Sequence, residues 1–81
     1  MKIRVKLFAA AKEITGSDEL IVDVPEESTV AEVQQAVIEA VPAMSKIMPH
    51  VLWAIGTEYV SPDTRVAANS DVAMIPPVSG G

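Results

Sequence analysis

The sequence predicts an α+β fold in which one main helix covers a mixed β-sheet. Residues 2–8 and 19–24 alternate between apolar and polar side chains, as half-exposed strands do. Valines then recur at three- and four-residue spacing from Val30 to Val41, which predicts an amphipathic helix. Further apolar runs separated by turn residues follow, so we expect the chain to finish in short strands.

Length and composition exclude several classes of protein. The 81 residues suffice for one domain that buries roughly 60% of its unfolded surface. A net charge of −5 disfavours binding to nucleic acid or to anionic membranes. The chain contains no cysteine, which excludes disulfides, thiolate metal sites and thiol nucleophiles. We find no signal peptide and no apolar run of transmembrane length, so we expect a cytoplasmic protein.

The first half of the chain predicts a hairpin. In residues 2–8, Ile3, Val5 and Leu7 share one face of a strand, and the basic side chains share the other. Residues 8–14 are good helix formers, and Gly16 is a natural helix end. Residues 19–24 form a second strand that Pro25 ends. The two strands and their short helical link predict a broad antiparallel hairpin.

The main helix begins after Thr29. Thr29 and Glu32 fit a capping box, and we interpret Glu26 and Glu27 as complements to the helix dipole rather than as a catalytic pair. Pro42 ends the helix. A second short helical segment is expected over residues 43–50, and three of its side chains should turn inward. These are Met44, Ile47 and Met48.

The second half predicts three short strands. Residues 51–55 and 59–60 form two of them around a turn at 56–58, and residues 61–64 form another turn. Asn69 suits a left-handed turn position before the last strand, residues 72–75. If that strand pairs with the first, the arrangement is a β-grasp fold. We therefore predict a β-grasp domain over residues 1–75 and an extended tail over residues 76–81.

The tail is the candidate functional segment. Pro76 and Pro77 fix two φ angles and favour an extended strut. Gly80 and Gly81 lack a Cβ atom, so the chain could enter a narrow channel in a partner. Six residues extend about 20 Å at roughly 3.3 Å each, which would deliver the terminal carboxylate as a reactant. The alternative is an idle tail, as many domains have.

Other candidate sites are weaker. His50 is the only histidine, and we interpret it as a surface or boundary residue because a metal site needs several converging donors. We predict no metal site. Trp53 lies in a predicted strand and is expected in the core, with a partner interface as the alternative. Neither Gly16 nor Gly56 is followed by the residues of a phosphate-binding loop.

The motifs together resemble a known family. Val5-Lys6-Leu7-Phe8-Ala9, Lys12 to Gly16, the capped helix and the ending from Asp71 to Gly81 resemble the small, MoaD-type sulfur-carrier subunit of molybdopterin synthase, a ubiquitin-like protein. The resemblance spans the whole chain, and Pro-Pro-Val-Ser-Gly-Gly is its most specific motif. Two positions depart from the family pattern: Met74-Ile75 replaces an aromatic residue before the prolines, and Asn69 replaces a turn glycine.

The resemblance implies a carrier with no enzymatic activity of its own and no stably bound cofactor. A ubiquitin-activating-like adenylyltransferase would use ATP to join AMP to the Gly81 carboxylate, and a sulfur donor would convert it to a thiocarboxylate. The large subunit, in a heterotetramer of two small and two large chains, would present cyclic pyranopterin monophosphate to that sulfur. Met74 and Ile75 would dock on each partner. The tail residues that position Gly81 would be Pro76, Pro77, Val78, Ser79 and Gly80.

Three alternatives remain at this point. A thiamine-pathway sulfur carrier shares the fold and the terminal Gly-Gly but usually lacks the two prolines. A ubiquitin-like modifier would end with Gly81 in an isopeptide bond to a lysine. A plain interaction module would keep its function without Gly80 and Gly81.

Overall fold

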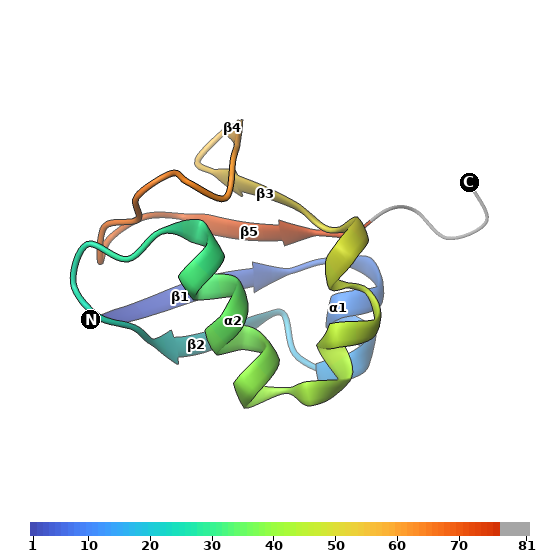
Figure 1. Ribbon diagram of the computed structural model, residues 1–81. Helices are drawn as coiled ribbons and strands as arrows, with labels where there is room; N and C mark the ends of the chain where they lie inside the picture. The colour runs from blue at the N-terminus through green and yellow to red at the C-terminus, as the bar shows by residue number, and fades with distance from the viewer. Residues whose placement is uncertain (77–81) are drawn as a thin grey trace.

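The computed structural model describes residues 1–76, and residues 77–81 lie outside the described part (Figure 1). Five strands, two α-helices and two short 3₁₀ helices make up the body, and the 3₁₀ helices follow the second α-helix in the chain. In chain order the elements are β1 (Lys2–Leu7), α1 (Ala9–Thr15), β2 (Glu19–Asp23), α2 (Val30–Ala40), η1 (Pro42–Lys46), η2 (Met48–His50), β3 (Leu52–Ile55), β4 (Glu58–Val60) and β5 (Val72–Ile75).

The strands form one mixed sheet in the order β2-β1-β5-β3-β4. β5 lies at its centre, parallel to β1 and antiparallel to β3. β1 and β2 form the predicted antiparallel hairpin. Figure 1 shows α2 crossing one face of this sheet, with α1 and the 3₁₀ helices at the end where β5 finishes. The α+β, β-grasp prediction is therefore confirmed.

The core lies between α2 and the sheet. Val30, Val33 and Val37 of α2 are fully buried, as the valine spacing predicted. β1 buries Ile3, Val5 and Leu7 and exposes the residues between them. Trp53 is only 4% exposed, and its indole N–H donates to the Gln34 side-chain oxygen on α2 at 3.2 Å. Trp53 is thus a core residue.

Local signals set the ends of the helices. The Thr29 backbone N–H donates to a Glu32 carboxylate oxygen at 3.0 Å in the predicted capping box. Gly16 ends α1 with φ of 73°, a left-handed conformation that favours glycine. Glu26 and Glu27, which precede this helix, also lie near cations: Glu26 lies 3.5 Å from the Met1 ammonium nitrogen and Glu27 lies 3.2 Å from the Arg65 guanidinium.

The second half follows the prediction with two differences. The segment expected to be helical over 43–50 is two 3₁₀ helices, in which Met44 and Met48 are buried. Asn69 lies in a turn but does not adopt a positive φ; Ala9 and Glu27 are the non-glycine residues that do. The Ser70 hydroxyl accepts a hydrogen bond from the Ala67 backbone N–H at 3.0 Å, which closes this turn. None of the helices within residues 1–76 combines the length and hydrophobicity that crossing a bilayer requires.

Candidate functional site: the base of the C-terminal tail

The central strand β5 leads directly to the tail. Its residues alternate across the sheet, so Val72 and Met74 are fully buried under the helices while Ala73 and Ile75 face the opposite side. Pro76, the first residue of the predicted tail, is also buried. β5 has a neighbouring strand on each edge, so Pro76 follows directly from an interior strand of the sheet.

The docking prediction requires a correction. Met74 has no exposed surface, because β5 directs its side chain into the core opposite Leu7 and Trp53. Its side chain therefore cannot contact a partner of the folded protein. Ile75 lies on the other side of the sheet and is half-buried, so it remains a docking candidate.

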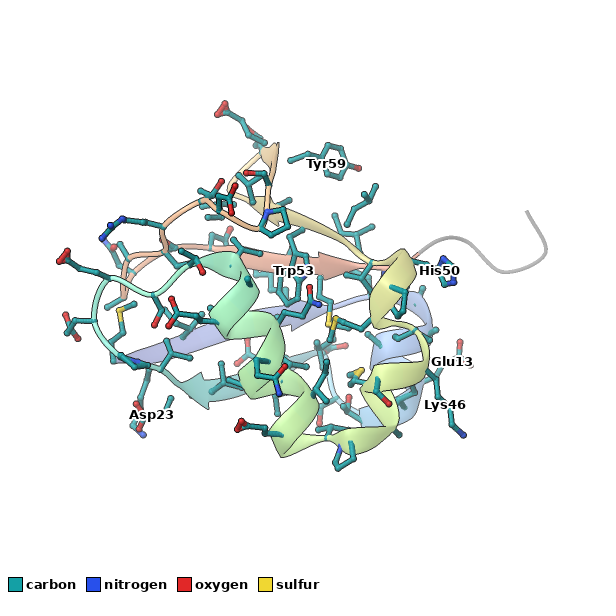
Figure 2. The ribbon with its side chains drawn as sticks, in the orientation of Figure 1. Glu13, Asp23, Lys46, His50, Trp53 and Tyr59 are labelled. Atoms are coloured by element: carbon teal, nitrogen blue, oxygen red, sulfur yellow. The ribbon has the colours of Figure 1, made fainter. Side chains whose placement is uncertain are left out.

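Several apolar side chains surround Ile75 on the sheet face away from α2. Leu52 lies directly opposite Ile75 across the β3–β5 pair and is 58% exposed. Tyr59 of β4 is 69% exposed and projects from the strand (Figure 2). Phe8 follows β1 in an extended conformation and is 48% exposed. We call the following surface the exit face: Phe8, Leu52, Ala54, Tyr59, Ala73 and Ile75.

Two alanines form the floor of the exit face. Ala54 pairs with Ala73 on one side and with Tyr59 on the other, so all three lie in one row across the sheet. The neighbouring row contains Leu52 and Ile75. Small residues therefore separate the larger apolar side chains of the exit face.

The other half of this sheet face is charged, but its charges are paired. Three cations of β1 each meet a carboxylate: Lys2 and Asp23 at 3.4 Å, Arg4 and Glu19 at 3.4 Å, and Lys6 and Asp71 at 3.3 Å. A hollow over this region is lined mainly by residues of these pairs and by the 68–70 turn. It holds no converging set of unpaired polar groups, so we do not interpret it as an active site.

The described side chains offer little chemistry of their own. Among residues 1–76 no cluster of three or more histidine or acidic side chains could hold a metal ion. His50 is exposed and lies near the end of β5 (Figure 2). The pKa of Lys12 is raised above 10.5 because Asp18 accepts a hydrogen bond from it at 2.7 Å and carries the opposite charge. A raised pKa makes this amine a poorer base or nucleophile at neutral pH.

The predicted chemistry of the tail falls on residues that the structure does not describe. Gly81, Gly80, Ser79, Val78 and Pro77 lie outside the described part, and their roles remain predictions. The structure adds Phe8, Leu52 and Tyr59 to the candidate site. Sequence reasoning missed Leu52 because it lies within an apolar run, where the pattern does not reveal which residue faces solvent.

The comparison with known proteins identifies the family, since a model of the ThiS family matches residues 5–81. The chain belongs to the ThiS family. It is 34% identical to the molybdopterin synthase sulfur carrier subunit of Caenorhabditis elegans, and the match covers 100% of this chain and 99% of that protein. The resemblance inferred from the sequence is confirmed.

A second relative of this chain is named as a modifier protein rather than as a sulfur carrier. It is 32% identical to small archaeal modifier protein 1 of Haloferax volcanii, over 94% of this chain and 97% of that protein. A crystal structure of SAMP1 from the same organism superposes with a TM-score of 0.88 at 31% identity and covers both chains completely. The two names, carrier and modifier, define the candidate functions.

Proposed function

We propose that this protein is the sulfur-carrier subunit of a molybdopterin synthase. The observation that carries the proposal is its full-length match to a sulfur carrier subunit, and the Pro-Pro-Val-Ser-Gly-Gly ending that follows the central strand supports it. The chain would not be an enzyme by itself. It would serve as the sulfur-donating subunit, without a stably bound cofactor, and would act in the cytoplasm.

The proposed chemistry takes place at the Gly81 carboxylate. A ubiquitin-activating-like adenylyltransferase would join this carboxylate to the α-phosphate of ATP, releasing pyrophosphate. Sulfur from a donor would then attack the carbonyl carbon, and AMP would leave. The resulting thiocarboxylate sulfur would attack cyclic pyranopterin monophosphate in the large subunit, and two such transfers would build the dithiolene. The catalytic side chains belong to the partners in this scheme.

The geometry supports separate roles for two parts of the chain: the exit face would bind the partner, and the tail would deliver the Gly81 carboxylate. The exit face places Leu52 and Ile75 beside the last described residue of the tail, so a partner bound there would receive the terminus. Five residues after Pro76 extend at most about 17 Å, which sets the depth of the channel. A buried Pro76 and the following Pro77 would reduce the conformational entropy lost on insertion. We propose the large subunit, in a two-plus-two heterotetramer, as the partner.

Substitution of Gly81 tests this function. Gly81→Ala should abolish sulfur transfer to the pterin precursor while the melting temperature stays unchanged, because the substitution leaves every core residue of the described part intact. Asn69→Ala is the matched control, since Asn69 is exposed in a turn without a positive φ. Molybdopterin formation is measured with the activating enzyme, ATP, a sulfur donor and the large subunit. Full transfer by Gly81→Ala would refute the proposal.

A second candidate is protein modification. The relation to an archaeal modifier protein supports it, and the same activated Gly81 would then form an isopeptide bond with a lysine of another protein. A blot of cell extracts for covalent adducts separates the two functions, because a pure carrier leaves none. The thiamine-pathway carrier is less favoured because of the two prolines. A plain interaction module would require that a variant lacking Gly80 and Gly81 keeps full activity.

A further inference from the structure

Ala9 has a backbone conformation that alanine rarely adopts. Its φ is 50°, on the left-handed side where the Cβ atom crowds the backbone, which destabilises residues that carry a side chain. Three other residues within 1–76 have a positive φ. Gly16 and Gly56 have no Cβ atom, and the Glu27 carboxylate lies 3.2 Å from the Arg65 guanidinium. Ala9 has only an exposed methyl group, so its side chain makes no polar interaction that offsets the strain.

Ala9 lies where the chain turns from β1 into α1. Phe8 is still extended, with φ of −126° and ψ of 156°, whereas α1 begins at Ala9. On one side of Phe8, the Leu7 backbone N–H donates to the Asp18 carbonyl oxygen at 2.7 Å. On the other side, the Ala11 backbone N–H donates to the Phe8 carbonyl oxygen at 3.1 Å, and the Ala11 side chain is fully buried. Phe8 therefore lies between two anchored residues, and Ala9 is part of the link to the second.

The strand pairing places Phe8 at the end of an apolar row on the exit face. β1 and β5 run parallel with Leu7 opposite Met74, so the same register carried on by one residue sets Phe8 level with Ile75. Leu52 lies on the other side of Ile75. Phe8 and Leu52 are both largely exposed. Of the three large side chains in this row, Phe8 is the one that lies beyond the end of its strand.

We propose that Ala9 is a positioning residue for partner binding, because its restricted left-handed backbone holds Phe8 in the row with Ile75 and Leu52. This inference rests on the proposed docking of the large subunit on the exit face. The left-handed region open to alanine is small, whereas glycine has a wide choice of backbone angles at positive φ. A methyl group at position 9 therefore narrows the motion of Phe8 before the partner binds, so less conformational entropy is lost on binding. The same methyl group lowers the stability of the fold and raises the affinity for the partner.

Ala9→Gly separates these two effects. Glycine adopts a φ of 50° without crowding, so the urea midpoint of unfolding should stay the same or rise. Affinity for the large subunit, measured by titration calorimetry, should fall about fivefold, because Phe8 then becomes ordered only on binding. Ala10→Gly is the matched control. Ala10 is the next residue of α1 and has no positive φ, so its urea midpoint should fall and its affinity should stay unchanged.

A double-mutant cycle tests whether Ala9 acts through Phe8. Phe8→Ala should weaken binding about 30-fold and change the urea midpoint little, since the side chain is half-exposed. Adding Ala9→Gly to the Phe8→Ala chain should then weaken binding no further.

An equal fivefold loss from Ala9→Gly in both backgrounds would overturn the positioning role. Unchanged affinity in either single variant would overturn it too, and a lower urea midpoint in Ala9→Gly would overturn the strain at Ala9. Each of these results leaves the proposed function intact. If the native chain does not bind the large subunit at all, the proposed function itself is refuted.

Discussion

The two faces of strand β5 differ in almost every respect although their residues alternate along four positions. On the side of α2, Met74 is fully buried between Leu7 and Trp53. On the other side, Ile75 lies opposite an exposed Leu52. We infer that the first face maintains the fold and the second recognises partners. One strand thus joins the core to the proposed recognition surface, and the tail follows that strand in the sequence.

The largest expected effect on stability comes from the side of β5 that faces α2. Met74→Ala should lower the free energy of unfolding by about 2–5 kcal/mol, because it leaves a cavity at a fully buried position. Ile75→Ala is the matched substitution on the exit face and should lower the free energy of unfolding by less than half as much. Urea denaturation followed by circular dichroism measures both. Equal losses would show that the two faces contribute alike to stability.

Substitutions on the exit face should show the reverse behaviour, with a large effect on partner binding and a small effect on stability. Leu52→Asp should weaken binding to the large subunit roughly 30-fold, or about 2 kcal/mol, because it places a charge in an apolar contact. The free energy of unfolding should change by less than about 0.5 kcal/mol, since Leu52 is largely exposed. Asp63→Ala, in an exposed turn outside the exit face, serves as control. Unchanged affinity, measured by titration calorimetry, would remove Leu52 from the recognition surface.

A smaller effect tests whether α2 stabilises the fold without contacting the partner. Glu32→Ala removes the acceptor of the Thr29 backbone N–H and should cost about 1 kcal/mol of unfolding free energy. Binding to the large subunit should stay unchanged. Glu39→Ala on the exposed side of the same helix is the control and should change neither quantity. A loss of affinity in Glu32→Ala would extend the recognition surface to α2.

The smallest effect concerns the Lys12–Asp18 ion pair, which belongs to neither face. Asp18→Asn should lower the pKa of Lys12, because it removes the charge and weakens the hydrogen bond that raise it. In the native protein the folded pKa is above the unfolded value, so the pair stabilises the fold below pH 10.5 and loses this contribution as pH rises through the folded pKa. NMR titration of Lys12 tests the direction of the shift.

The sequence predicted those parts of the fold in which polar and apolar residues alternate. β1 and β2 show a clear two-residue period, so their buried faces followed directly. The capping box and the valine spacing predicted α2 in the same way. These signals are local, because each depends only on residues that are close together in the sequence.

The site was harder to predict because its strands lack alternation. Val51-Leu52-Trp53-Ala54-Ile55 and Val72-Ala73-Met74-Ile75 are apolar throughout, so either set of alternate residues could face the core. Tertiary packing decides this: Trp53 hydrogen-bonds to Gln34 of α2 and pairs with Met74, which turns Leu52 and Ile75 outward. The pairing of Glu26 and Glu27 with distant cations likewise depends on contacts that sequence spacing does not show.

The most direct measurement is the intact mass of the purified chain after incubation with ATP, the activating enzyme and a sulfide donor. If the body exists to present a main-chain carboxylate, the mass should rise by the difference between one sulfur and one oxygen atom, and fragmentation should locate the change at Gly81. The same sample should then convert the pterin precursor when the large subunit is added. An unchanged mass alongside full molybdopterin formation would contradict the account.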